Sequence, residues 1–240
     1  MIGHYLGKYP IVNLMCQHSV ARKKSRLLRR LFSVIGPMAI KLVGYPFNRF
    51  ARARAKEVVR HLKPEAGDKI LDFGCGIGCY VMEFALNYAC TCVGVDIDEE
   101  DIGPANKIKS LLKLGNVDFF THIDHSRYGG YFDKIISSEV LEHIDDDKGT
   151  LEKFSAMLKP DGKCVLTVPL TSDPIEYGKP NPQYWNHVRS GYSLDSFKSR
   201  MAGTDFLIDE FKICCNKRSL LLVLRKNGRQ LSHPPLENVG

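Results

Sequence analysis

The chain has 240 residues, of which 44% are hydrophobic and 25% charged, with a formal net charge of +7. This length suffices for one sizeable α/β domain with an appendage and excludes two full domains. The composition is that of an ordinary soluble globular protein.

Charge is distributed unevenly along the chain. Residues 1–63 hold 14 lysines and arginines and one acid, whereas residues 64–240 hold 20 basic and 26 acidic side chains. The basic character therefore belongs to an N-terminal extension, and it indicates a polyanionic neighbour, either nucleic acid or an anionic membrane surface.

The extension combines a basic cluster at residues 21–30 with an apolar stretch at residues 31–47. Prolines, glycines and Lys41 interrupt that stretch, so we predict no membrane-spanning helix, and its position does not suit a signal peptide. Two interpretations stay open. The favoured one is a helical lid over a ligand cleft, and the other is a segment (residues 21–47) that lies on a membrane.

The first strong motif is an apolar run, residues 70–73, that breaks at Gly74 and is followed by Gly76 and Gly78. This pattern predicts a buried strand, a tight turn and a helix. Glycine suits a turn that needs positive φ and close approach to a ligand. The third glycine comes one residue earlier than in the dinucleotide fingerprint G-x-G-x-x-G, and Asp72 stands just before the turn.

Two further strands are predicted at the expected intervals. Residues 91–95 form the second, and Asp96 follows at its carboxyl end, where a carboxylate binds ribose hydroxyls in nucleotide-binding sheets. This supports a nucleoside ligand without saying which one. A third strand at residues 117–121 leads into Ile123 and Asp124.

Strands and helices continue to alternate, which predicts a parallel sheet with right-handed crossovers. The remaining predicted strands are 132–137, 163–168, 206–214 and 220–225, and the predicted helices are 48–62, 79–88, 100–114, 148–158 and 194–202. The last two strands are joined by a turn too short for a parallel crossover, so we expect an antiparallel hairpin.

These motifs together resemble the class I S-adenosylmethionine (SAM) methyltransferases. Residues 70–80 look like motif I of that superfamily, and residues 132–143 (Phe-Asp-Lys-Ile-Ile-Ser-Ser-Glu-Val-Leu-Glu-His) match its motif IV region. The chain is similar in particular to the type 11 small-molecule methyltransferases, which include the ubiquinone-biosynthesis O-methyltransferases. The resemblance covers roughly residues 55–225.

The resemblance implies an α/β fold. It is a doubly wound, seven-stranded, mostly parallel sheet of order 3-2-1-4-5-7-6, whose last strand is antiparallel and whose two faces carry helices. It also divides the chain into a basic N-terminal helical extension (1–54), the methyltransferase domain (55–228) and a polar tail (229–240).

The resemblance further implies SAM as the cofactor. The glycine turn would admit the methionine moiety, the carboxylate after strand two would bind ribose, and two isoleucines would wall the adenine. The residues assigned to the cofactor are Asp72, Gly74, Cys75, Gly76, Gly78, Asp96, Ile97, Ile123, Asp124 and Glu139.

Methyl transfer is an in-line displacement, so positioning and deprotonation of the acceptor are what the protein adds. We predict His143 and His187 as candidate catalytic bases. Glu139, Glu142 and His143 match positions that hold a divalent metal in the ubiquinone-biosynthesis O-methyltransferases. Relatives without metal carry the same string, with the histidine packing beneath the site, and no metal is predicted here.

The connection at residues 169–191 is expected to form the acceptor pocket, as it does in the superfamily. We predict that Tyr184, Trp185 and Arg189 contact an acceptor that has a ring or apolar chain and an anionic group. A loop that packs only for stability is the alternative.

The sequence thus predicts a SAM-dependent methyltransferase acting on a small-molecule or lipid-like acceptor, at oxygen. Cysteines scattered over strands and turns are typical of a reducing cytoplasm, where we expect the protein, with membrane contact as an option. An RNA methyltransferase that uses the basic arm is less favoured, because no RNA-binding module is found. A non-enzymatic partner subunit with this fold is the third hypothesis, and the sequence gives no oligomeric state.

Overall fold

The computed structural model describes residues 49–184 and 186–227. The predicted lid or membrane segment at residues 21–47 and the polar tail at 229–240 lie outside the described residues, as does Trp185. Within them, the predicted boundary at residue 54 falls inside one continuous helix, α3 (Arg49–Leu62).

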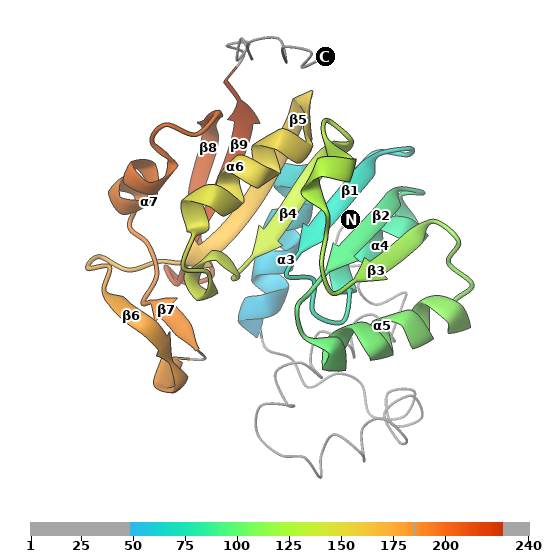
Figure 1. The fold of residues 1–240 in the computed structure, drawn as a ribbon, viewed down its shortest axis with the longest axis horizontal. Coiled ribbons are helices and arrows are strands. Elements are labelled where there is room, and N and C mark those ends of the chain that lie inside the picture. Colours follow the sequence, from blue (N-terminus) through green and yellow to red (C-terminus); the bar gives the residue numbers. More distant parts are fainter. Residues whose placement is uncertain (1–48, 185, 228–240) are drawn as a thin grey trace, which may run out of the picture.

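A seven-stranded sheet forms the centre of the molecule (Figure 1). Its order is β3-β2-β1-β4-β5-β9-β8, and β9 alone among its strands runs antiparallel to β5 and β8. The strands are β1 (Lys69–Phe73), β2 (Thr91–Val95), β3 (Val117–Phe120), β4 (Phe132–Ser138), β5 (Leu158–Pro169), β8 (Phe206–Cys214) and β9 (Ser219–Lys226). The predicted order is confirmed, because β8 and β9 are the sixth and seventh strands of this sheet along the chain.

Helices cover both faces of the sheet, which confirms the doubly wound arrangement. On one face lie α3, α4 (Cys79–Asn87) and α5 (Glu99–Leu111), and on the other α6 (Asp147–Met157) and α7 (Leu194–Met201). Neighbouring strand residues point to opposite faces, so Ile70 is buried beneath the first group and Leu71 beneath the second. Each face of the sheet thus packs on its own hydrophobic core, and the two cores hold in place the strands whose carboxyl ends carry the candidate site.

Two stretches differ from the prediction. Strand β5 begins at Leu158, five residues early, because Leu158 pairs with Phe132 and an irregularity absorbs the intervening residues. In the predicted loop at residues 169–191, β6 (Glu176–Asn181) and β7 (His187–Arg189) pair as a separate antiparallel ribbon. Strand β6 is exposed or half-buried along its length, so it lacks the alternating pattern that would reveal a strand.

Six cysteines of the described residues are buried: Cys75, Cys90, Cys92, Cys164, Cys214 and Cys215. Among the helices described, none has the length and apolar character that a membrane crossing requires.

Candidate active site

The turn after β1 has the backbone conformation that the glycines predict. Gly74, Gly76 and Gly78 have φ values of 77°, 54° and 79°, and Gly74 N–H donates to the Val95 carbonyl at 2.8 Å. A Cβ at Gly74 would clash with Val140, whereas a Cβ at Gly76 would meet no described residue nearer than Asp101 Oδ2, at 3.9 Å. The space over Gly76 is therefore open to a ligand.

Asp96 connects this turn to the end of β2. Its Oδ2 accepts a hydrogen bond from Gly76 N–H at 2.7 Å, and its Oδ1 accepts one from Asp98 N–H at 3.0 Å. A carboxylate oxygen has two lone pairs, so each oxygen retains capacity for another donor. The predicted contact with ribose hydroxyls is compatible with this geometry.

The residues predicted to contact adenine follow β2 and β3. Ile97 is 82% exposed, and Ile123 is half-buried against the hydrophobic core on the face covered by α6 and α7. Asp124 is exposed and begins a short 3₁₀ helix, η2 (His125–Tyr128), where it accepts hydrogen bonds from Ser126, which lower its pKa. The three stand at the same sheet edge, and their adenine contacts stay predictions.

Asp72 is a buried carboxylate at the end of β1. Burial, together with the charge of Asp96, raises its pKa to about 8. Its Oδ2 has no hydrogen-bond partner among the described residues. Cys75 is also buried, which raises its thiol pKa and keeps it protonated. A cationic ligand would compensate the buried negative charge of Asp72.

Glu139 follows β4 in a left-handed backbone conformation, with φ of 57°. Its N–H donates to the Thr167 carbonyl at 2.7 Å, and its Oε2 lies 3.5 Å from Arg54 Nη1 on α3. Its Oε1 is buried without a partner among the described residues. A non-glycine residue held in this conformation is typical of functional sites.

Tyr80 is a site residue that the sequence reading missed. It lies in the first turn of α4, its hydroxyl is hydrogen-bonded to Ser138, and burial raises its pKa to about 12. The charges of Arg54 and Glu139 also act on this hydroxyl, so it shares their surroundings. The sequence does contain a feature that could have indicated Tyr80, because this residue follows Gly78 by two positions in a helix that begins at the glycine turn.

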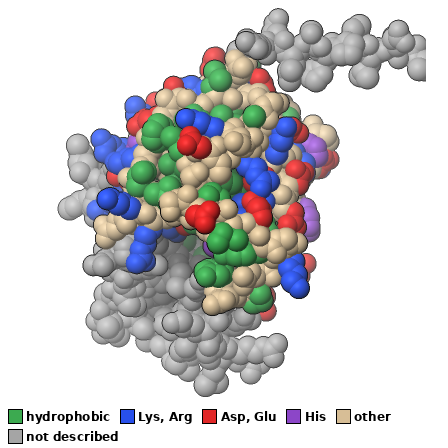
Figure 2. All heavy atoms as spheres, turned by 90° about the vertical axis from the view of Figure 1, so that its left-hand side faces the viewer, with side chains coloured by type: hydrophobic (Ala, Val, Ile, Leu, Met, Phe, Trp, Pro, Cys, Tyr) green, Lys and Arg blue, Asp and Glu red, His purple; other side chains and the backbone are tan. Residues whose placement is uncertain are grey.

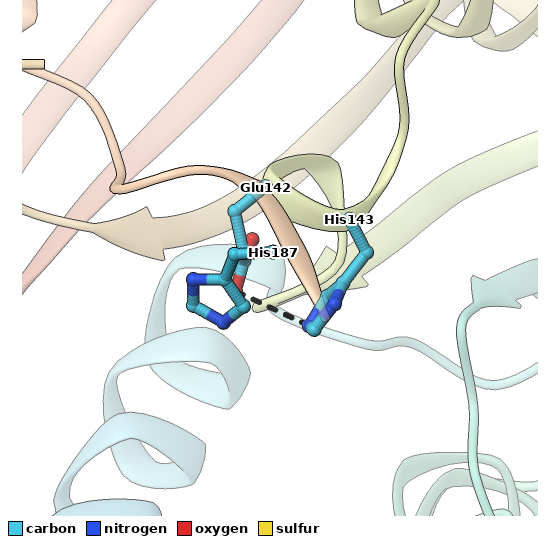
Figure 3. Close-up of side chains that lie close together, drawn as sticks. All are labelled: Glu142, His143 and His187. Carbon is cyan, nitrogen blue, oxygen red and sulfur yellow. Dashed lines mark ion pairs between the residues drawn. The ribbon is translucent and has the colours of Figure 1, made fainter. Parts of the chain in front are cut away.

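The two candidate bases lie together (Figure 3). His143 ends the 3₁₀ helix η3 (Leu141–His143), His187 begins β7, and their ring centroids are 4.5 Å apart at an interplanar angle of 84°. Glu142 reaches the same point, with Oε1 3.9 Å from His143 Nε2. Burial, followed by the charge of Glu139, raises the pKa of Glu142 to about 8.

Arg189 corrects one prediction. The side chain is 2% exposed, and its guanidinium hydrogen-bonds within the protein instead of facing an acceptor. Its partners are Glu176, Tyr192 and the carbonyls of Leu141, Ile144 and Asp145, at 2.7 to 3.1 Å. Its donors are used, so Arg189 fixes the η3 turn to the β6–β7 ribbon and thereby brings His143 and His187 together.

Tyr184 remains available to an acceptor. It is 47% exposed in η4 (Pro182–Tyr184) and stacks on Tyr177, with ring centroids 5.4 Å apart. This aromatic pair stands on the ribbon that also carries His187.

SAM fits the part of the site around the glycine turn. SAM carries two cationic groups, an ammonium and a sulfonium, and β1 and the residue after β4 offer buried oxygens without partners among the described residues, Asp72 Oδ2 and Glu139 Oε1. The open space at Gly76 allows the backbone to approach the ligand closely.

Comparison with known proteins agrees with this geometry. The family model described as "Methyltransferase domain" matches residues 45–210, well over half of the chain. The chain is 33% identical over 150 residues to phosphoethanolamine N-methyltransferase 1 of Zea mays, covering 58% of this chain and 27% of the relative. It is 27% identical over 125 residues to the ubiquinone biosynthesis O-methyltransferase of Erwinia tasmaniensis, covering 51% of each.

Among solved structures, Haemonchus contortus phosphoethanolamine N-methyltransferase 2 in complex with SAM has the same fold. Its TM-score is 0.55 at 22% identity, over 66% of this chain and 38% of that one. The matched segment spans between about a quarter and a half of the two curated relatives' length. The chain belongs to the methyltransferase-domain family, and its cofactor is S-adenosylmethionine.

We expect Asp96→Asn to weaken SAM binding at least about tenfold, or about 1.4 kcal/mol, because a charge-assisted hydrogen bond to ribose is lost. The amide oxygen can still accept from Gly76, so the turn persists. Asp118→Asn is the matched control, because Asp118 lies on neighbouring β3 and pairs with Lys109. Calorimetry measures both, and an unchanged affinity in Asp96→Asn would refute the ribose assignment.

SAM affinity should rise with pH and level off above about 8, where Asp72 ionises in the free protein. The cationic ligand favours the carboxylate, so binding below that pH releases a proton from Asp72. The same titration with Asp72→Asn corrects for ionisation of the ligand and of other groups. Identical pH profiles for the two proteins would show that Asp72 does not sense the cofactor.

Arg189→Lys should lower the free energy of unfolding by about 3 kcal/mol or more, because it leaves buried partners of the guanidinium unsatisfied. Arg200→Lys is the control, since Arg200 contacts the same Asp147 and Glu176 from the surface and its loss costs about 1 kcal/mol at most. Denaturant unfolding measures both. If both substitutions lowered the free energy of unfolding by the same small amount and Arg189→Lys raised KM, the predicted contact of Arg189 with the acceptor would be restored.

Proposed function

We propose that the chain is a SAM-dependent methyltransferase that transfers the methyl group in line to an oxygen of a small or lipid-like molecule. The observation that carries this proposal is the contact between the imidazoles of His143 and His187, beyond the end of β4. Glu139 precedes His143 by four residues and stands at the methionine end of the proposed cofactor site. This neighbourhood supports a role for the histidines on the side from which an acceptor would approach the methyl group.

The proposed reaction requires a general base for the acceptor and little stabilisation of the leaving group. A sulfonium leaves readily, whereas a phenolic hydroxyl with a pKa of about 10 must lose its proton as the bond to carbon forms. One imidazole takes that proton, and the other lies in contact with it. The proton then passes to solvent, because the His143 side chain is 33% exposed.

The acceptor would lie between this pair and the β6–β7 ribbon. The stacked rings of Tyr177 and Tyr184 offer an apolar surface to a ring or a chain. The guanidinium of Arg189 hydrogen-bonds within the protein, so the structure gives no support to its predicted contact with an anionic group of the acceptor. Trp185 stays a predicted contact outside the described residues.

The relatives support a small-molecule acceptor, since their names refer to phosphoethanolamine and to ubiquinone biosynthesis. They differ in the atom methylated, nitrogen or oxygen. The proposal favours oxygen because two adjacent imidazoles suit the deprotonation of a hydroxyl.

Nucleic acid is not favoured as a partner of the described residues. On the face of α7 and the β6–β7 ribbon, basic and acidic side chains are interspersed (Figure 2). A surface that binds nucleic acid is expected to gather basic side chains. A non-enzymatic role would not explain why Asp72 Oδ2 and Glu139 Oε1 are buried without hydrogen-bond partners among the described residues. The cytoplasmic location and the role of residues 21–47 stay predictions.

The test is transfer of labelled methyl from SAM into a fractionated lysate, with products divided among organic solvent, nucleic acid, protein and small soluble molecules. Label in the organic or small-molecule fraction supports the proposal, and label in nucleic acid or protein refutes the acceptor class. No label in any fraction, from a protein that binds SAM, favours the partner-subunit hypothesis.

His187→Ala is expected to leave SAM affinity unchanged and to lower kcat at least about tenfold, because a general base contributes roughly 10²–10⁴-fold. His122→Ala is the matched control, because His122 is an exposed imidazole that contacts Thr121 near the end of β3. A kcat in His187→Ala equal to that of the control would remove His187 from the mechanism.

A further inference from the structure

We propose that Glu142, His143 and His187 bind a divalent transition-metal ion. The three side chains converge from two segments, η3 and β7, that are more than 40 residues apart in the chain (Figure 3). One ligand atom from each lies within 4.8 Å of the other two. Two imidazoles and a carboxylate form a three-ligand set that zinc adopts in catalytic sites, with a further position open.

Glu142 supplies the observation that points to a ligand. Its side chain is 1% exposed, and its Oε2 has no hydrogen-bond partner among the described residues. Burying a carboxylate without compensation is costly, so such groups are paired or coordinate metals. Arg189, the nearby buried cation, is paired with Asp147 and Glu176.

His143 is oriented as metal-binding histidines are. Its Nδ1 lies 3.4 Å from the Asn186 carbonyl, which accepts a hydrogen bond in the tautomer that is protonated at Nδ1. Nε2 then carries the lone pair, on the side where Glu142 Oε1 lies 3.9 Å away. Donation from the second ring nitrogen to a backbone carbonyl is a usual outer contact of histidine ligands.

The spacing is slightly wider than in a filled site. Ligand atoms in tetrahedral zinc centres are roughly 3.3 Å apart, which follows from bonds of about 2.0 Å. The part-exposed His143 imidazole can rotate to close the difference, and its exposed edge gives an ion access from solvent.

This ligand set differs from the one that the family resemblance suggested, Glu139 with Glu142 and His143. Glu139 pairs with Arg54 instead, and His187 takes the third position. Replacing a carboxylate by an imidazole changes the preferred ion, because Mg²⁺ favours oxygen ligands, whereas zinc, cobalt and nickel accept imidazole. The site should therefore select these ions over Mg²⁺.

With an ion bound, the two imidazoles would serve as ligands instead of bases, and the ion would lower the pKa of an acceptor hydroxyl at its open position. This catalytic role of the ion rests on the proposed function, whereas ion binding itself does not, since it is measured without cofactor or acceptor. The amino-acid sequence alone predicts no metal, and this inference revises that prediction.

The experiment titrates the chelator-treated full chain with Co²⁺, followed by its visible absorption, and with Zn²⁺, followed by calorimetry. We expect one site with the absorption bands of nitrogen- and oxygen-bound cobalt, undisturbed by millimolar Mg²⁺. Glu142→Gln and His187→Asn should each weaken Zn²⁺ binding by about tenfold or more. His122→Asn should not, because His122 lies outside the cluster.

SAM affinity, measured on each variant, verifies that the fold persists. Zn²⁺ affinities that are equal in the parent, Glu142→Gln and His187→Asn would overturn the inference, as would the absence of binding. Methyl transfer by a metal-free protein whose Zn²⁺ affinity is negligible would refute the site and leave the proposed function standing. Specific Zn²⁺ binding without methyl transfer would support the metal site and contradict the proposed function.

Discussion

The hydrogen bonds of the Asp96 carboxylate hold together the cofactor half of this molecule. One oxygen fixes Gly76 in the turn after β1, and the other fixes Asp98 at the start of α5. Two loops from neighbouring parallel strands are thereby held at one edge of the sheet. The open space over Gly76 exists because this geometry is held without any side chain at that position.

The other half of the site depends on Arg189. Three backbone carbonyls around η3 point at one guanidinium, which β7 supplies. The Leu141 carbonyl also accepts from Ile144 N–H at 3.1 Å, and a buried cation with several donors can bind it together with the two carbonyls that follow the short helix. The two histidines owe their contact to this connection, because one lies on each of the segments that it joins.

The sequence predicted what is encoded locally. The glycine turn, Asp72 and Asp96 lie within about 25 residues, and their spacing alone indicates a nucleoside site at the carboxyl edge of parallel strands. Strand order followed from the alternation of strands and helices and from the short turn before β9. These features depend on residues close together in the chain.

What could not be predicted depends on distant partners. The type of Arg189 suggests an anion ligand, and only the folded chain shows that carbonyls about 45 residues earlier use its donors. His187 and Glu142 likewise meet through the fold. Strand β6 escaped detection because its residues are exposed or half-buried throughout, and the early part of β5 because proline and glycine indicate a turn.

The buried charge of the cofactor pocket has a consequence for the end of the reaction cycle. Methyl transfer converts a sulfonium into a neutral thioether, so Asp72 and Glu139, if they contact the methionine end as predicted, would face one positive charge fewer. Asp72 has a raised pKa whenever that compensation is missing, so it takes up a proton as the charge disappears. We expect the loss of this attraction to weaken the binding of the spent cofactor and so to favour its exchange for a fresh molecule.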